Sequence, residues 1–182
     1  MSGRENALPR KLAKPASGAG QAAVLIGTTL GDFRIESFIG SGRMAWVYAA
    51  EQLSLGRKVA LKVIQEGVFT PSDSIRRFQR EARILGRLEH PNIVPVYAAG
   101  YTQHKELSYY YIAMRLAHGG TLVETLHDGI TCTTALTWAN EICHALACAH
   151  RAGVVHRDVK PANVLIQKKY GAAHRFRPVA TA

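Results

Sequence analysis

Cysteine is scarce in this sequence, and its few thiols follow no metal-binding or redox pattern. The 182 residues include only Cys132, Cys143 and Cys148, an odd number without Cys-x-x-Cys spacing. Such a set argues against a disulfide framework and against a structural zinc site. We expect the three thiols to be free and buried.

Long apolar segments are also missing. No run of about 18 apolar residues occurs, and the amino terminus lacks an apolar stretch followed by a small-residue cleavage site. The sequence therefore contains no recognisable transmembrane segment or signal peptide, and we expect a cytoplasmic protein. A content of 47% hydrophobic and 20% charged residues is that of an ordinary globular chain.

Acidic residues are outnumbered by basic ones. The sequence has 13 Asp and Glu residues against 23 Lys and Arg residues, which gives a formal net charge of +10. This excess is compatible with nucleic acid, acidic lipid or a phosphate-bearing ligand. The basic residues are spread over several segments without the interleaved aromatic residues of single-strand binders, so we do not expect nucleic acid as a partner.

The order of hydrophobic patterns predicts a sheet followed by helices. Period-two alternation and turn residues predict strands over residues 33–39, 46–50, 58–64, 93–99 and 109–116, with a polar loop over residues 102–106. Apolar residues at spacings of three and four predict one helix over residues 75–88. Further helices are expected near residues 122–126 and 136–150, and Gly153 is placed to end the last one.

Three separate features of the sheet region are compatible with phosphate binding. Gly40-Ser41-Gly42 forms the tip of the first hairpin, where the lack of side chains lets backbone amides approach phosphate oxygens. Lys62 ends an apolar strand segment, and Glu81 is the only acidic residue between Ile75 and Leu88 on the next helix. Taken one by one, these are also compatible with an ordinary tight hairpin and a solvated lysine.

The strongest motif follows the long helix. His156-Arg157-Asp158 is followed by Lys160-Pro161 and, five residues after the aspartate, by Asn163. A polar surface turn between two short strands is the alternative interpretation. In the order glycine loop, Lys62, Glu81 and Asp158/Asn163, however, the set resembles the catalytic domain of bacterial-type serine/threonine protein kinases.

This resemblance covers roughly residues 31–166 and implies a fold and a site. The implied fold is α+β and protein-kinase-like, with a five-stranded antiparallel N-lobe sheet, one helix and an incomplete, mainly helical C-lobe. The implied ligands are ATP and Mg²⁺, and the implied partners are protein substrates with Ser or Thr hydroxyls. Asp158 would accept the proton of the hydroxyl, Lys160 would neutralise charge on the phosphoryl group, and Asn163 would bind the metal. The resemblance assigns nucleotide binding to Ile39, Gly40, Gly42, Val47, Ala60, Lys62, Glu81, Met114, Arg115 and Leu116.

The sequence departs from the family at two places. Ala45 stands where a third loop glycine is usual, and no Asp or Glu follows Asp158, although the family places a second metal-binding aspartate there. We therefore expect a shortened kinase copy with very low activity of its own, an exposed apolar face on the long helix, and marginal stability. The oligomeric state is not encoded.

The resulting domain prediction has four parts. Residues 1–30 are expected to be a flexible basic leader, 31–116 the ATP-binding lobe, 117–166 the start of the second lobe, and 167–182 a tail unlike the family. A catalytically dead nucleotide-binding or regulatory module is the alternative function. A small-molecule phosphotransferase of related fold is a second rival, against which Lys160-Pro161 argues.

Overall fold

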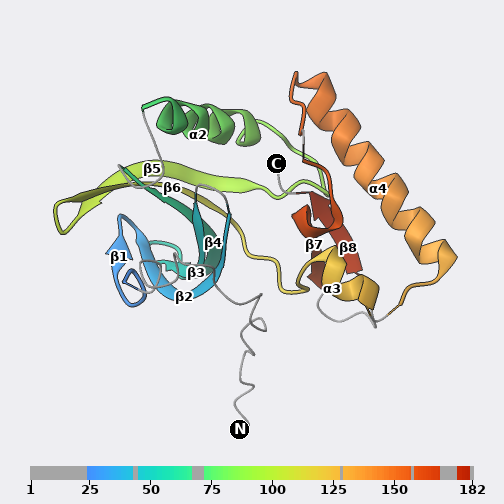
Figure 1. Ribbon diagram of the computed structural model, residues 1–182, viewed down its shortest axis with the longest axis horizontal. Coiled ribbons are helices and arrows are strands. Elements are labelled where there is room, and N and C mark those ends of the chain that lie inside the picture. Colours follow the sequence, from blue (N-terminus) through green and yellow to red (C-terminus); the bar gives the residue numbers. More distant parts are fainter. Residues whose placement is uncertain are drawn as a thin grey trace, which may run out of the picture.

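The computed structural model describes residues 24–42, 45–66, 72–127, 129–156, 158–168 and 176–180 (Figure 1). Within these ranges, the side chains of residues 72–75, 77, 81, 168 and 176–180 are outside the description. A curved antiparallel sheet with one helix on it forms the first part of the fold. A smaller part built around a long helix follows.

The sheet contains six strands in the order β1-β2-β3-β4-β6-β5. They are β1 (Thr29–Leu30), β2 (Phe33–Ser41), β3 (Trp46–Gln52), β4 (Arg57–Gln65), β5 (Val96–His104) and β6 (Leu107–Arg115). The five strands expected from the sequence are all present, and the prediction of an antiparallel sheet is confirmed. The additional strand is the two-residue β1 at one edge.

The predicted leader over residues 1–30 is wrong at its carboxyl end. Among the described residues, the segment from Val24 onward belongs to the fold, because Leu25 and Leu30 are 1% and 0% exposed. Burying these two leucines in the sheet core outweighs the cost of ordering a short turn. Residues 1–23 of the expected leader lie outside the described residues.

The polar loop expected over residues 102–106 is also different. β5 and β6 continue to His104 and Leu107, and only Lys105 and Glu106 form the turn, both with positive φ. Two consecutive residues with positive φ match the right-handed twist of paired strands, so polar side chains do not interrupt the hairpin. β5 begins three residues later than expected, directly after Pro95, which has no amide hydrogen to donate.

The sheet is curved, and its concave face encloses a core of its own side chains. Alternate residues of β2, β3, β4 and β6 meet there, with Leu25 and Leu30 from the segment before β2; the cluster is Leu25, Leu30, Phe33, Ile35, Trp46, Tyr48, Ala50, Val59, Leu61, Val63, Tyr109 and Ala113. Gly100 on β5 lets the Tyr111 ring cross the strand, since a Cβ at Gly100 would lie 2.5 Å from the Tyr111 hydroxyl. The curl brings β1 near β5, although these strands are opposite edges of the sheet.

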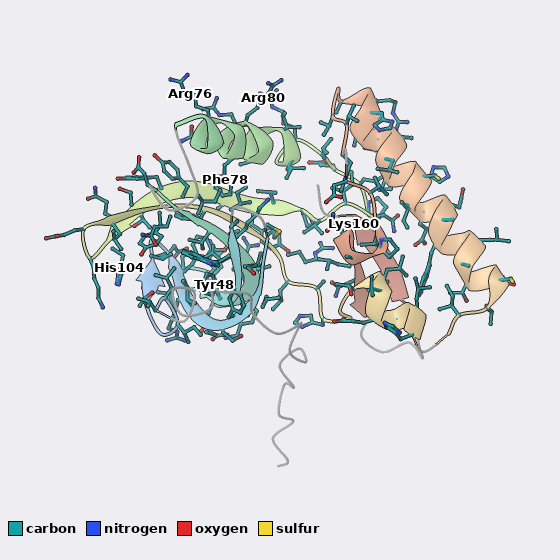
Figure 2. The ribbon with its side chains drawn as sticks, viewed as in Figure 1. Tyr48, Arg76, Phe78, Arg80, His104 and Lys160 are labelled. Atoms are coloured by element: carbon teal, nitrogen blue, oxygen red, sulfur yellow. The ribbon has the colours of Figure 1, made fainter. Side chains whose placement is uncertain are left out.

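The other face of the sheet carries α2 (Ser72–Leu85). Phe78 and Ala82 of the helix pack against Ile64 of β4 and Ile112 of β6. Figure 2 shows Phe78 between the helix and the sheet, with Arg76 and Arg80 pointing the opposite way. The three-and-four spacing of the apolar residues thus fixes which side of α2 is buried.

The second part of the fold joins the first through the end of α2. It contains α3 (Leu122–His127), α4 (Cys132–Arg151), the 3₁₀ turn η1 (Pro161–Asn163), β7 (Val164–Lys168) and β8 (Phe176–Ala180). Leu85, Leu88 and Ile93 pack against Ala145 and Ala149 of α4. This apolar contact fixes the orientation of α4 relative to the sheet.

The tail contains a strand that the sequence did not predict. β8 pairs antiparallel with β7, and Pro178 lies opposite Ile166 in that ladder. Strand formation depends strongly on an available partner and less on side-chain alternation, so β7 can recruit a segment with weak local preference. Proline is tolerated because β8 is an edge strand of this two-stranded sheet.

The exposed face of α4 agrees with the expected apolar patch and corrects one prediction. Leu136 is 72% exposed. Cys132 and Cys143 are exposed too, so the expectation of buried thiols is wrong for these two, while Cys148 is half-buried. No other described element packs over this row of α4, which explains why apolar helical spacing did not lead to burial.

Among the described helices, none is long and apolar enough to cross a membrane.

We expect this exposed row to drive concentration-dependent association. Leu136→Gln should reduce light scattering and the apparent mass at high concentration, because it removes the largest exposed side chain of the row. It should change the free energy of unfolding by less than about 0.5 kcal/mol, as is usual for a solvent-facing position. Asn140→Leu is the matched control, because it adds apolar surface and should increase association. If light scattering showed the same association for Leu136→Gln as for wild type, the exposed row would not have this role.

Candidate functional site

An apolar cluster forms where four strands meet the segment after β6. Ala49 of β3, Ala60 of β4 and Leu116 are buried, and Ile39, Val47 and Met114 pack against them. The register explains the cluster, because Ala60 is paired with Ala49 on one side and with Met114 on the other. Five of its six residues are among those predicted to bind a nucleotide. Ala49 is the sixth, and sequence reasoning missed it, although it follows Val47 at the two-residue spacing of a shared strand face.

Lys62 lies on the same face of β4 as Ala60, two residues further along the strand. It is paired with Val47 of β3 and with Ile112 of β6. Its Nζ atom is 6.0 Å from the centre of the Phe78 ring of α2. Glu81 follows on the same helix, but its side chain is outside the description, so the predicted Lys62–Glu81 ion pair stays a prediction.

The two glycines of the first hairpin lie next to this face. Gly40 is paired with Val47, and the amide of Gly42 donates a hydrogen bond to the Ala45 carbonyl at 2.8 Å. A Cβ at Gly40 would meet no atom within 4 Å, and one at Gly42 would meet only the Ala45 carbonyl oxygen at 3.8 Å. Packing within the described chain therefore does not require glycine here. Residues 43 and 44, at the loop tip, lie outside the described residues.

The predicted catalytic residues converge in the loop before β7. Nδ2 of Asn163 donates to the Asp158 carboxylate oxygen Oδ2 and to the Asp158 carbonyl, each at 2.8 Å. The same carboxylate oxygen forms an ion pair with Nζ of Lys160 at 2.8 Å. The amide of Asp158 donates to the carbonyl of His156 at 2.8 Å, which holds the loop in a tight turn. The three predicted residues thus form one contact group, as their spacing around η1 allows.

The charge of Asp158 is stabilised by these neighbours. Hydrogen bonding from Lys160, and then from Asn163, lowers the pKa of the Asp158 carboxyl below its ordinary value of 3.8. A lowered pKa keeps the carboxylate ionised throughout the neutral range. An ionised, solvent-facing carboxylate can accept a proton from an incoming hydroxyl.

We expect Lys160→Ala to raise the pKa of Asp158. The lysine is the largest cause of the lowered pKa, so its removal should move the pKa up toward 3.8. The Asp158 carboxylate would then begin to take up a proton at a higher pH as the solution is acidified. The measurement is a carbon-detected NMR titration of the Asp158 carboxyl, with Lys105→Ala as the control that should leave it unchanged. An equal titration curve in Lys160→Ala and wild type would contradict the ion pair.

The apolar cluster and the loop that carries Asp158 and Asn163 are connected through a glycine pair. Leu116 belongs to the cluster, and three residues later Gly119 packs against the backbone of Ile166 in β7. The amide of Ile166 donates to the Gly120 carbonyl at 2.9 Å, and Thr121 forms a bridge with Leu165. Because Asn163 directly precedes β7, this contact connects the two halves of the predicted site.

Arg115 is a predicted nucleotide-binding residue, but its backbone amide already donates a hydrogen bond within the chain. Its amide donates to the Pro95 carbonyl at 3.1 Å, and its side-chain Nε donates to the Tyr97 hydroxyl at 3.4 Å. The side chain is exposed and points to the β5 side of the strand pair. Backbone groups after Arg115 are therefore better placed to contact a nucleotide base than the Arg115 amide.

The residues present fit ATP more completely than Mg²⁺. The apolar cluster is suited to binding a flat base. Lys62 and the backbone at Gly40 and Gly42, where no side chain blocks approach, are suited to binding phosphates. For the metal, Asn163 and Asp158 provide oxygens, yet residues 159–182 contain no Asp or Glu. Within the described part of the chain, no three His, Cys, Asp or Glu side chains gather as a metal site. Because magnesium prefers several carboxylate and phosphate oxygens, the set is incomplete for it.

Comparison with known proteins identifies the class to which this fold and site belong. The model of the protein kinase domain family matches residues 33–174, so the chain belongs to that family. This match includes eight residues of the tail that was expected to be unlike the family. The predicted α+β kinase-like fold is confirmed.

The curated relatives that the chain resembles include bacterial serine/threonine-protein kinases. It is 41% identical over 146 residues to the serine/threonine-protein kinase PrkC of Bacillus subtilis, and 37% identical over 150 residues to PknJ of Mycobacterium tuberculosis. These alignments cover 79% and 82% of this chain but only 22% and 25% of the relatives. The chain thus spans about a quarter or less of the relatives' length.

Solved structures give the same result. The kinase domain of Mycobacterium tuberculosis PknI matches with a TM-score of 0.68 at 28% sequence identity. The match covers 85% of this chain and 60% of that domain. The similarity therefore includes both the sheet and the part around α4.

Proposed function

We propose that the chain binds ATP and takes part in phosphoryl transfer to serine or threonine hydroxyls of proteins. The observation that carries the proposal is the grouping of Ile39, Val47, Ala60, Met114 and Leu116 on one sheet face, with Lys62 two residues from Ala60. Residues 31–116, together with 24–30, would form the ATP-binding lobe, and residues 117–166 would begin the second lobe. The family membership supports the same assignment.

The base of ATP would lie against the apolar cluster. The small side chains of Ala49 and Ala60 would let a flat ring lie close to the sheet, and Val47 and Leu116 would contact its two faces. Lys62 would hold phosphate oxygens as a point charge, and backbone amides near Gly40 and Gly42 would approach the terminal phosphates. Each group supplies positioning and charge, on which phosphoryl transfer mainly depends.

Asp158 would orient the substrate hydroxyl and accept its proton. The hydroxyl oxygen attacks the terminal phosphorus, the bond from phosphorus to the bridging oxygen breaks, and ADP leaves. Lys160, already 2.8 Å from Asp158, would screen negative charge at this point. Magnesium supplies further charge neutralisation when bound, and Asn163 is the residue that would contact it. Because the carboxylate set for the metal is incomplete, we expect little transfer by the 182-residue chain alone.

The experiment compares transfer of labelled γ-phosphate to a Ser/Thr-rich test protein by wild type and Asp158→Asn. We expect slow incorporation by wild type, at least about tenfold above the variant, because loss of a positioned general base typically costs about 10²–10⁴-fold. Both proteins should bind ATP equally, which isothermal titration calorimetry would check. Equal incorporation with retained ATP binding would overturn the transfer step and favour a nucleotide-binding or regulatory module, which the incomplete metal set also favours.

A further inference from the structure

A row of arginines covers the outer side of α2. Arg76, Arg80, Arg83 and Arg87 follow one another at spacings of four, three and four residues, and all four are exposed. The hydrogen bond from the Gly86 amide to the Ala82 carbonyl continues the helical path toward Arg87. The row therefore runs along one side of the helix for roughly 16 Å at about 1.5 Å per residue. Figure 2 shows Arg76 and Arg80 pointing away from the sheet.

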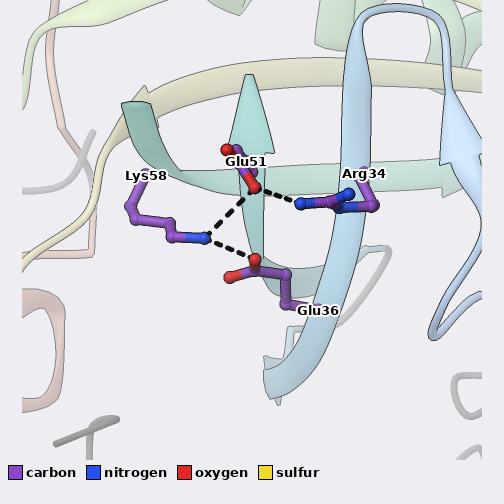
Figure 3. Close-up of polar contacts among 4 residues, drawn as sticks. All are labelled: Arg34, Glu36, Glu51 and Lys58. Carbon is purple, nitrogen blue, oxygen red and sulfur yellow. Dashed lines mark hydrogen bonds and ion pairs between the residues drawn. The ribbon is translucent and has the colours of Figure 1, made fainter. Parts of the chain in front are cut away.

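These arginines differ from two basic residues of the sheet, Arg34 and Lys58. Arg34 and Lys58 form ion pairs with Glu51 and Glu36, as Figure 3 shows. Among the described side chains, by contrast, no carboxylate lies within ion-pair distance of the four arginines of α2. Of the two acidic residues of the helix, Asp73 is in its first turn and Glu81 lies off the row by helical spacing. Arg34 and Lys58 are thus paired with carboxylates of the sheet, whereas α2 presents a net positive face.

The composition of this face favours one kind of partner. Gln79 and Gly86 are the other exposed residues described between Arg76 and Arg87, and no large apolar side chain is exposed on the described part of α2. Proteins usually bind a lipid surface by inserting apolar groups, and they bind single-stranded nucleic acid by stacking aromatic groups on the bases. The described part of this face offers neither kind of group. Every basic residue in the row is arginine, whose planar fork binds a carboxylate through two parallel hydrogen bonds.

We propose that the outer face of α2 docks an acidic helical segment of a partner protein, whose carboxylates recur once per turn. A helix with Glu or Asp at the same spacing of four, three and four residues presents one carboxylate to each guanidinium, because both helices have a pitch of about 5.4 Å. The inner face of α2 stays packed on Ile64 and Ile112, so docking requires no unfolding of the helix. This surface is separate from the proposed ATP site and does not depend on phosphoryl transfer.

The test uses the full chain and a fluorescein-labelled helical peptide with four Glu at that spacing, measured by anisotropy at low salt. A peptide of the same composition, with the Glu distributed around the helix, is the first control. We expect Arg76→Gln/Arg80→Gln to weaken binding about tenfold, since two exposed bidentate pairs are removed. The charge-matched pair Arg34→Gln/Lys105→Gln should weaken it less than about twofold, because the remaining effect is screened net charge.

Several results would overturn the proposal. No detectable binding of the peptide would show that α2 does not dock such a helix. Equal binding of the redistributed peptide, or equal losses in the two double variants, would each show that only net charge matters. Tighter binding to a duplex DNA oligonucleotide or to phosphatidylserine vesicles, lost in Arg76→Gln/Arg80→Gln, would assign the surface to another class of partner. A charge-swap check adds support if Arg76→Glu/Arg80→Glu binds the same peptide with Lys in place of Glu. Far-ultraviolet circular dichroism confirms that each variant keeps its helices.

Discussion

Ala60→Leu is expected to weaken ATP binding strongly while the chain stays folded. Ala60 is 8% exposed at the centre of the apolar cluster, with Ala49 and Met114 as its cross-strand neighbours. A leucine there would occupy the space assigned to the base, and the clash would fall on the ligand. We expect the Kd for ATP to rise at least about thirtyfold, equivalent to ~2 kcal/mol. Titration calorimetry of ATP measures the loss, and urea unfolding should show a fall in the free energy of unfolding of about 1 kcal/mol, the low end of the range for overpacking.

The matched control is Ala50 of β3, which lies on the opposite face of the sheet. Ala50 is 0% exposed inside the core beneath the curled sheet. Ala50→Leu should therefore lower the free energy of unfolding by about 2 kcal/mol through overpacking, while the folded fraction keeps its ATP affinity. If Ala60→Leu bound ATP as well as wild type, or if both variants lost binding equally, the assignment of this face to the nucleotide would be wrong.

The sheet was predictable from the sequence because successive side chains of a strand point to opposite faces, and the apolar residues of each strand follow this period of two. In β3 and β4, residues such as Tyr48 and Leu61 fill one face, and residues such as Val47 and Lys62 occupy the other. A local sequence pattern does not show which distant segment will pack against it or pair with it. The wrong predictions for the leader, the tail and the cysteines have this cause. The segment before β2 is ordered by the core that buries Leu25, and β8 by its pairing with β7. Cys143 follows the apolar spacing of a buried helix face, yet no described element covers it.

The candidate site was predictable to the extent that its residues lie in sequence motifs. The contact group of Asp158, Lys160 and Asn163 lies within six residues of chain, so a single turn brings the side chains together. The nucleotide face is different, because it is assembled by register between β3, β4 and β6. Ala49 joins that face through pairing with Ala60, and the only local signal for it is its two-residue spacing from Val47. The engagement of the Arg115 amide with Pro95 is likewise visible only in the folded chain.

Gly119→Ala is expected to have the largest effect on stability of any single glycine substitution in the connection between the two parts. A Cβ at Gly119 would lie 2.1 Å from the Ile166 carbonyl oxygen and 2.7 Å from its carbonyl carbon. Both are backbone atoms of β7, so a side-chain rotation cannot relieve the clash. We expect the free energy of unfolding to fall by about 3 kcal/mol, the upper part of the range for overpacking. Urea denaturation gives the value.

A second measurement locates the damage. The amide of Ile166 donates to the Gly120 carbonyl, and this bond should be lost if β7 moves away from the glycine pair. Hydrogen exchange at Ile166 should therefore become faster in Gly119→Ala, while exchange at amides within β3 and β4 follows the global stability. Gly129→Ala is the matched control: its φ is +76°, but a Cβ there meets no atom within 4 Å. It should cost only about 1 kcal/mol of backbone strain. Similar losses in the two variants, or unchanged exchange at Ile166, would show that the close contact with β7 does not hold the loop of Asp158 and Asn163 to the sheet.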